Sequence, residues 1–503
     1  MKNFVLFFLL VFFLKNSFAQ TITYTEPESE DARNLDFEII GKVGGNLLVY
    51  KNIRNRFAVS VYDNDMKLKQ RTDLDFIPDK TLNVDFVAYP DFAYLIYQYQ
   101  KKNILYCMAA KIDGEGNVLK EPFELDTTYI SFFADNKIYS TINSEDKSKI
   151  MIYKIQKKND NFNFTTLLFN DSLQLLNRSR LVTDYDERRS AFSDFFVAND
   201  GTFVFTRGTK SNSRDFLESA DLITKAPLSN VFQANSLNLA GNYLDEIKLK
   251  VDNVNNHYLI NSLFYNKKRG NVEGLYTAVW NKNGNVLISQ NFAELKDSVR
   301  AMAKTDGALR YALNDFFIRD VILKNDGGFI LAAEDHSTQS RGNPWNRYDY
   351  LYGYPYSYNS YYLYSPSSYW YSGRPRNYFN SNSQVRYYYD NIVVLNLDAT
   401  GNLVWSNVIR KSQFDDNTDN FLSYNTIVTG GELHFLFNSL ERRNQLINDQ
   451  SISPSGEITR YPPLRSLDRG YEFMPRYAKQ VSSHQIIIPC TYRNYICFAK
   501  IDY

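Results

Sequence analysis

Two stretches decide the fold: Asn325-Asp326-Gly327-Gly328-Phe329-Ile330-Leu331 and, further along, Leu395-Asn396-Leu397-Asp398-Ala399-Thr400-Gly401-Asn402-Leu403-Val404-Trp405. In each of them, apolar strand residues flank a turn that contains glycine. Asp-Gly and Gly-Asn pairs supply the positive φ that tight turns between strands require. Both stretches therefore predict β-hairpins.

The same two-part phrase recurs along the chain. Its second half returns, with decreasing fidelity, at 111–119, 280–287, 452–458, 62–68 and 169–175. Its first half returns at 199–205, preceded by Asp194-Phe195-Phe196-Val197, just as Asp315-Phe316-Phe317-Ile318 precedes the fullest copy. Repeats of roughly 40 to 50 residues built from short strands are typical of a β-propeller.

These motifs resemble the blades of repeat propellers in exported Bacteroidota-type proteins, which read DGGF-I-L followed by LD-x-x-GN-L-x-W. The resemblance is closest over about 315–411 and extends over 81–126 and 243–295. It implies an all-β propeller and an export route, and it implies no common activity.

Strand-rich segments predict eight blades, with seven as the fallback count. The segments are 35–78, 81–126, 127–182, 189–242, 243–295, 313–411, 420–464 and 469–503. The last segment holds only three strands, so we expect Thr21-Ile22-Thr23-Tyr24-Thr25 to supply the fourth strand and close the ring without an open sheet edge. A frayed N-terminal tail is the alternative.

The predicted organisation is a signal peptide at 1–19 followed by a single propeller domain at 20–503. Lys2, the apolar run Phe4–Leu14 and Ser17-Phe18-Ala19 match the three regions of a secretory signal peptide. Periplasmic or extracellular localisation follows. No later stretch reaches the roughly 20 consecutive apolar residues of a transmembrane helix.

The near-neutral net charge limits the classes of binding partner that the protein is expected to have. The 503 residues carry 57 basic and 56 acidic side chains, which argues against nucleic-acid binding by bulk electrostatics. We expect a monomer without a cofactor that recognises its partner locally. One short helix is predicted between blades at about 293–305, where apolar residues recur at spacings of three and four.

An insertion at about 341–389 separates the two diagnostic hairpins and exceeds an ordinary loop. Tyrosine among Ser, Gly and Asn is the composition of selected binding loops. The candidate binding residues are Tyr348, Tyr350, Tyr352, Tyr354, Tyr356, Tyr358, Trp370, Arg374 and Arg376. The alternatives are a low-complexity excursion without a partner and a tyrosine ladder packed on the rim of its own propeller.

Cys490 and Cys497 face each other if the last hairpin turns at Arg493-Asn494. An oxidising compartment would permit a disulfide between them. The alternative is two small apolar residues in adjacent strands, and Cys107 is expected in the core.

Familiar catalytic motifs are missing from the sequence: it has no phosphate-binding glycine loop, no His-Glu-x-x-His and no Gly-x-Ser-x-Gly. Glu334-Asp335-His336, at the mouth of the insertion, could form an acid–base group, although a solvated loop entry is the simpler interpretation. Asp415, Asn417 and Asp419 follow calcium-loop spacing but lack the expected Gly and final Glu. Three histidines occupy similar strand positions and could either converge or stay isolated: His257, His434 and His484.

The sequence therefore favours an exported, non-enzymatic propeller that binds a protein or glycan at the cell envelope through its rim and insertion. One alternative is a polysaccharide-acting enzyme that uses carboxylates such as Glu334 and Asp335. Another is a purely structural component of the envelope.

Overall fold

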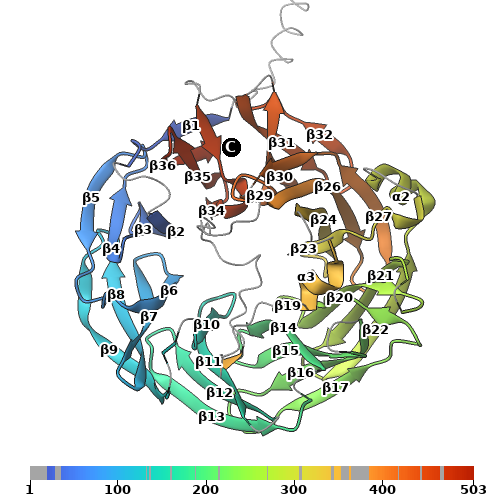
Figure 1. The fold of residues 1–503 in the computed structure, drawn as a ribbon, viewed down its shortest axis with the longest axis horizontal. Helices are drawn as coiled ribbons and strands as arrows, with labels where there is room; N and C mark the ends of the chain where they lie inside the picture. Colours follow the sequence, from blue (N-terminus) through green and yellow to red (C-terminus); the bar gives the residue numbers. More distant parts are fainter. Residues whose placement is uncertain are drawn as a thin grey trace, which may run out of the picture.

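The computed structural model describes residues 20–28, 35–131, 133–134, 137–158, 161–186, 189–212, 216–268, 270–304, 309–340, 345–352, 362–363, 385–416, 418–441, 444–464 and 470–503. The predicted signal peptide and most of the tyrosine-rich insertion lie outside these ranges. Within them, antiparallel sheets surround a central axis as in a β-propeller, which confirms the predicted fold class (Figure 1).

The first half of the ring is a series of four-stranded meanders. The first sheet contains β2 (Leu35–Val43), β3 (Asn46–Ile53), β4 (Arg56–Tyr62) and β5 (Leu68–Asp73). The second contains β6 (Thr81–Ala88), β7 (Phe92–Lys101), β8 (Ile104–Asp113) and β9 (Val118–Tyr129). The third contains β10 (Ser140–Asn143), β11 (Lys149–Lys158), β12 (Asn161–Asn170) and β13 (Leu175–Thr183).

A nine-stranded sheet follows, made of two consecutive meanders joined through β18 (Tyr243–Leu244). One meander contains β14 (Ser190–Val197), β15 (Phe203–Lys210), β16 (Leu217–Lys225) and β17 (Gln233–Leu237). The other contains β19 (Lys248–Asp252), β20 (His257–Tyr265), β21 (Gly274–Asn281) and β22 (Val286–Glu294). The number of blades depends on how this sheet is divided, so eight blades stays a prediction, with seven as the fallback.

The remaining three sheets complete the ring. One contains β23 (Phe316–Leu323), β24 (Phe329–Ser340), β26 (Val385–Leu397), β27 (Leu403–Ile409) and β28 (Gln413–Asp416). The next contains β29 (Tyr424–Thr429), β30 (Glu432–Glu441), β31 (Asn444–Ile452) and β32 (Ile458–Arg460). The last contains β33 (Tyr471–Phe473), β34 (Lys479–Ser482), β35 (Gln485–Tyr492), β36 (Tyr495–Asp502) and β1 (Thr21–Tyr24).

The turns between the third and fourth strands depend on a side chain as much as on glycine. Asp398 Oδ1 accepts hydrogen bonds from the backbone N–H groups two and four residues on, at 2.8 and 2.9 Å, and Gly401 has a φ of 77°. Asp63 makes the same two bonds, both at 2.9 Å, in a copy where Met66 takes a φ of 60° instead of glycine. The aspartate therefore specifies this turn even where the glycine is missing.

The N-terminal strand closes the ring, as predicted. β1 pairs antiparallel with β36, with Thr21 opposite Asp502 and Tyr24 opposite Ala499. The first and last sheets also share an apolar core, in which Phe37 of β2 meets Phe498 of β36 with ring centroids 5.3 Å apart. Closure thus uses both backbone pairing and side-chain packing.

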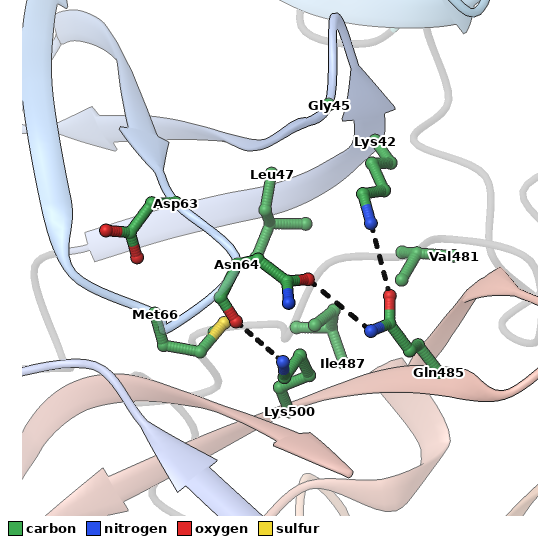
Figure 2. A pocket seen from close by; sticks show the side chains of 10 residues that line it. All are labelled: Lys42, Gly45, Leu47, Asp63, Asn64, Met66, Val481, Gln485, Ile487 and Lys500. Carbon is green, nitrogen blue, oxygen red and sulfur yellow. Dashed lines mark hydrogen bonds between the residues drawn. The ribbon is translucent and has the colours of Figure 1, made fainter. Parts of the chain in front are cut away.

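A small pocket lies on this seam, between the first and last sheets (Figure 2). Lys500 Nζ donates a hydrogen bond to the backbone oxygen of Asn64 at 2.6 Å. Gln485 accepts a bond from Lys42 and donates one to the Asn64 side chain, both at 3.4 Å. Because these polar groups hydrogen-bond to one another across the seam, the residues that line the pocket help to hold the first and last sheets together.

Helices are short in the described residues. α2 (Asp297–Ala303) lies inside the range predicted for the inter-blade helix, and buried Val299 and Ala303 join the apolar core beside β26. The 3₁₀ turns η2 (Leu309–Tyr311) and η3 (Pro475–Tyr477) connect strands. α3 (Arg347–Tyr352) and β25 (Tyr362–Leu363) belong to the insertion.

Candidate functional site

The insertion begins at the tip of an unusually long hairpin formed by β24 and β26. The ladder between these strands shifts register between Glu334 and His336, so that Glu334 pairs with Ile392 but His336 with Tyr389. Asp335 and Asp390 therefore both fall at an irregular step of the ladder. Such bulges turn side chains away from regular pairing and are frequent beside active sites.

This bulge is the centre of a cluster of ionisable side chains that we call the inner cluster. Its members come from β23 and the residue before it, from β24 and β26, from the segments after β27 and β28, and from η3: Asp315, Arg319, Glu334, Asp335, His336, Tyr389, Asp390, Lys411, Asp419 and Arg476. Glu334, His336 and Tyr389 are buried. The structure thus corrects the simpler interpretation of 334–336 as a solvated loop entry.

Asp335 has the electrostatics of a proton donor. Burial, followed by the negative charges of Asp315 and Asp390, raises the pKa of its carboxyl group to about 7, against the opposing charge of Lys411. A carboxyl group with a pKa near neutrality is present in both protonation states at physiological pH. It can therefore both donate and accept a proton.

His336 is held as a neutral imidazole. Burial, followed by the charge of Arg319, lowers its pKa well below the usual value. Its Nδ1 lies 3.1 Å from the backbone oxygen of Tyr388. Since a carbonyl oxygen only accepts, the proton of the neutral ring sits on Nδ1, and Nε2 carries the lone pair of a base.

Tyr389 lies directly beside His336, with ring centroids 4.3 Å apart. Its hydroxyl donates to Asp419 Oδ2 at 3.0 Å, and Arg476 Nη1 contacts the same carboxylate oxygen at 2.5 Å and the tyrosine oxygen at 3.2 Å. Burial raises the pKa of Asp419, but Arg476 and the Tyr389 hydrogen bond outweigh it and lower the pKa overall. Burial and the Asp419 charge raise the pKa of Tyr389 well above its usual value, so this hydroxyl keeps its proton.

A buried ion-pair network around Glu334 holds the strands on either side of the bulge. Glu334 lies 2.7 Å from Lys411 Nζ and 3.5 Å from Arg319 Nε, and it accepts a hydrogen bond from Ser423 Oγ at 2.6 Å. Lys411 also donates to the backbone oxygen of Tyr389 at 2.9 Å. This network ties β23, β24 and β26 together, so Glu334 is a positioning group beneath Asp335 and His336.

α3 lies on the inner side of the ring, near β19 and β23 (Figure 1). Trp345, just before α3, donates from Nε1 to Asp315 Oδ1 at 2.8 Å, and Tyr350 lies 5.2 Å from the His336 ring, centroid to centroid. Across the ring, β25 pairs with β11 through Leu363 opposite Ile155. These described parts of the insertion therefore lie inside the ring, and not on its rim, where the alternative of a packed tyrosine ladder would put them.

The predicted binding residues fare unequally. Tyr350 is part of α3 beside the inner cluster, and Tyr348 and Tyr352 lie on the same helix. The others fall outside the described residues: Tyr354, Tyr356, Tyr358, Trp370, Arg374 and Arg376. Trp345, Lys411 and Arg476 are not among the residues predicted from the sequence, because no local motif distinguishes them.

Cys490 and Cys497 do oppose each other, in β35 and β36, with Sγ atoms 2.9 Å apart and both side chains buried. We predict that oxidation joins them, because the register already places the sulfur atoms together. A disulfide that closes so short a loop is expected to stabilise the fold by about 2 kcal/mol. Peptide mapping under non-reducing conditions should recover a linked 490–497 peptide, and two free thiols in protein purified without reductant would contradict the prediction.

The remaining motifs do not assemble into sites. Asp419 of the calcium-like spacing faces Arg476, and Asn417 lies outside the described residues. His434 Nδ1 binds Asp449 Oδ1 at 2.9 Å, whereas His484 Nδ1 lies 3.2 Å from Thr429. Among the described residues, no group of three or more His, Cys, Asp or Glu side chains is arranged to hold a metal ion. In the same part of the chain, no helix has the length and apolar character needed to cross a membrane.

Comparisons with known proteins reveal resemblance only in structure, since no family model and no curated protein matches the chain. The polysaccharide lyase Uly1 is similar at 10% identity and a TM-score of 0.39, over 83% of this chain and 89% of that one. An ulvan lyase from a new polysaccharide lyase family is similar at 8% identity and a TM-score of 0.36, over 82% and 90%. Prolyl oligopeptidase B from Galerina marginata is similar at 8% identity and a TM-score of 0.41, over 92% of this chain but 56% of its own.

These comparisons contradict the prediction of a non-enzymatic binding protein, because the structures matched over most of their length are polysaccharide lyases. Identities of 10% or less and TM-scores near 0.4 carry no activity from those proteins to this chain. Its chemistry must therefore come from its own inner cluster.

Proposed function

We propose that this protein is an enzyme that cleaves a polysaccharide, with the inner cluster as its reacting centre. The observation that carries the proposal is Asp335, whose pKa is raised to about 7 by burial and by Asp315 and Asp390. Groups that catalyse proton transfer at neutral pH need a pKa near that pH, and environments that push carboxyl pKa values apart are typical of glycosidic bond cleavage.

Each neighbouring group has a role in this proposal. Asp335 in its protonated form donates a proton to the departing glycosidic oxygen. His336, neutral and protonated on Nδ1, offers Nε2 as the acceptor for a second proton. Tyr389 keeps its proton and, anchored by Asp419 and Arg476, orients the substrate through its hydroxyl group.

The surroundings suit a sugar. Phe317 and Tyr389 place aromatic rings beside His336, and aromatic rings with a few fixed polar groups are common in ligand sites. The predicted signal peptide would deliver the enzyme to the periplasm or the exterior, where envelope and environmental polysaccharides are available.

The test is incubation of the purified mature protein with a panel of neutral and acidic polysaccharides. New reducing ends without ultraviolet absorbance indicate hydrolysis, whereas ultraviolet absorbance from an unsaturated sugar indicates elimination. We expect one of these products from at least one polysaccharide. A folded protein that releases neither product from any member of a broad panel would contradict the proposed function.

A further inference from the structure

The inner cluster is covered by a helix from its own chain. Tyr350 of α3 and Trp345 just before it lie against His336, one of the two residues to which we assign proton transfer. Tyr350 lies 5.2 Å from His336 and 5.0 Å from Phe317, measured between ring centroids. Trp345 lies 5.4 Å from His336 by the same measure and occupies Asp315 Oδ1 through its indole N–H.

One residue fixes this helix in place. Arg347 Nε donates to Asp245 Oδ2 at 2.8 Å, and its Nη2 donates to the same oxygen. Its Nη1 donates to the backbone oxygen of Asn314 at 3.0 Å, while the guanidinium lies 3.8 Å from the centre of the Phe317 ring. The side chains of Arg347 and Asp245 are only 7% and 1% exposed.

Asp245, the partner of Arg347, belongs to a different part of the ring from the insertion. Asp245 follows β18 and belongs to the neighbouring meander, 102 residues away in sequence from Arg347. The pair therefore joins α3, in the insertion between β24 and β26, to the segment between β18 and β19 of the neighbouring meander. Replacing both partners of a buried ion pair often costs little stability, and ion pairs between packed elements are repacked in known two-state transitions.

We propose that α3 is an internal lid, latched by Arg347 and Asp245, which closes the inner cluster until it is displaced by substrate. The inference rests on the proposed function. In the closed state Trp345 and Tyr350 pack against the His336 ring, so a sugar ring can reach His336 only after they move. The apparent affinity for substrate is then lowered by the fraction of molecules that are closed.

The experiment compares the full mature chain with the double variant Arg347→Gln, Asp245→Asn. Changing both partners leaves no unpaired charge in the interior, so the variant should fold. The matched control is Arg386→Gln, which removes an exposed ion pair with Asp416 on the same hairpin. Equal melting temperatures establish that the three proteins are folded.

The first readout is labelling of histidine by diethyl pyrocarbonate, which attacks the neutral imidazole. His336 is 3% exposed, and the exposed His484 serves as an internal standard. We expect His336 to be labelled at least about tenfold faster in the double variant than in the wild type or the control, since minor open states are commonly 0.1–10% populated. Unchanged labelling would overturn the lid.

The second readout is turnover of the polysaccharide identified in the panel. A higher kcat/KM in the double variant supports the lid. A lower value in a folded variant overturns it, because α3 would then supply contacts to the substrate. Faster labelling of His336 without turnover in any of the proteins leaves the lid standing and counts against the proposed function alone.

Discussion

Asp335→Asn is expected to lower kcat by about 10²- to 10⁴-fold, which is the usual contribution of a positioned general acid or base. Asparagine has nearly the same shape as the protonated carboxyl group but carries no acidic proton. In the wild type, only the protonated form donates, and the pKa of Asp335 is raised to about 7 by burial and by Asp315 and Asp390. Activity should therefore decline as the pH rises through about 7, as measured by initial rates across the pH range.

The same substitution is expected to stabilise the fold at alkaline pH. The pKa of Asp335 is about 7 in the folded protein against about 3.9 in an unfolded chain, so the folded state binds more protons between these values. The wild type therefore loses stability as the pH rises from about 4 to about 7, by at most about 4 kcal/mol. Asparagine does not ionise, so the melting temperature of the variant should exceed that of the wild type above pH 7.

Asp194→Asn is the matched control for this result. Asp194, on β14, also has a pKa raised by burial, to about 6, and it accepts a hydrogen bond from the Leu249 N–H at 2.7 Å. The Asp194→Asn variant should be more stable than the wild type at alkaline pH and should keep wild-type activity. If Asp335→Asn keeps wild-type turnover, Asp335 is not the proton donor.

The fold could be predicted because its local signals are repeated. The residues of the turn at Asp398 and Gly401 occur again at several places in the sequence, so the repeat is visible without related sequences. The last strand-rich segment has only three predicted strands, which implies that the fourth strand comes from elsewhere in the chain. The copies without glycine looked weaker than they are, since Asp63 holds the same turn by its side chain while Met66 takes the positive φ. Repeats are therefore better traced by the aspartate than by the glycine.

The site could be predicted only in part. Glu334-Asp335-His336 was noted as an acid–base candidate, but the insertion that follows suggested exposure. The better signal is that the apolar run Phe329–Ala333 continues into these residues without a turn, as β24 does. Lys411 and Arg476 could not be found, because they reach the cluster from parts of the chain that only the closed ring brings together.

Removal of residues 20–27 is expected to destabilise the whole ring by about 3–5 kcal/mol, a loss that thermal unfolding followed by calorimetry should detect. The deletion removes β1 from β36 and leaves an open sheet edge. It also removes the backbone bond from Thr25 to Phe498, at 2.9 Å. Glu28, the ion-pair partner of Lys51, is then held on this edge by its own backbone bond to the Ile496 oxygen at 2.8 Å and no longer by the strand before it.

Two variants separate these contributions. Thr21→Ala changes an exposed side chain and keeps the strand, so it should melt like the wild type. Glu28→Gln keeps β1 but removes the charge opposite Lys51, whose pKa is already lowered by burial, and it should cause part of the loss. If the deletion melts with the wild type, β1 is a passive appendage and the seam of Figure 2, with its packed core, holds the ring closed unaided. If the deletion lowers the free energy of unfolding by more than Glu28→Gln does, the difference is the contribution of β1, because only the deletion removes that strand.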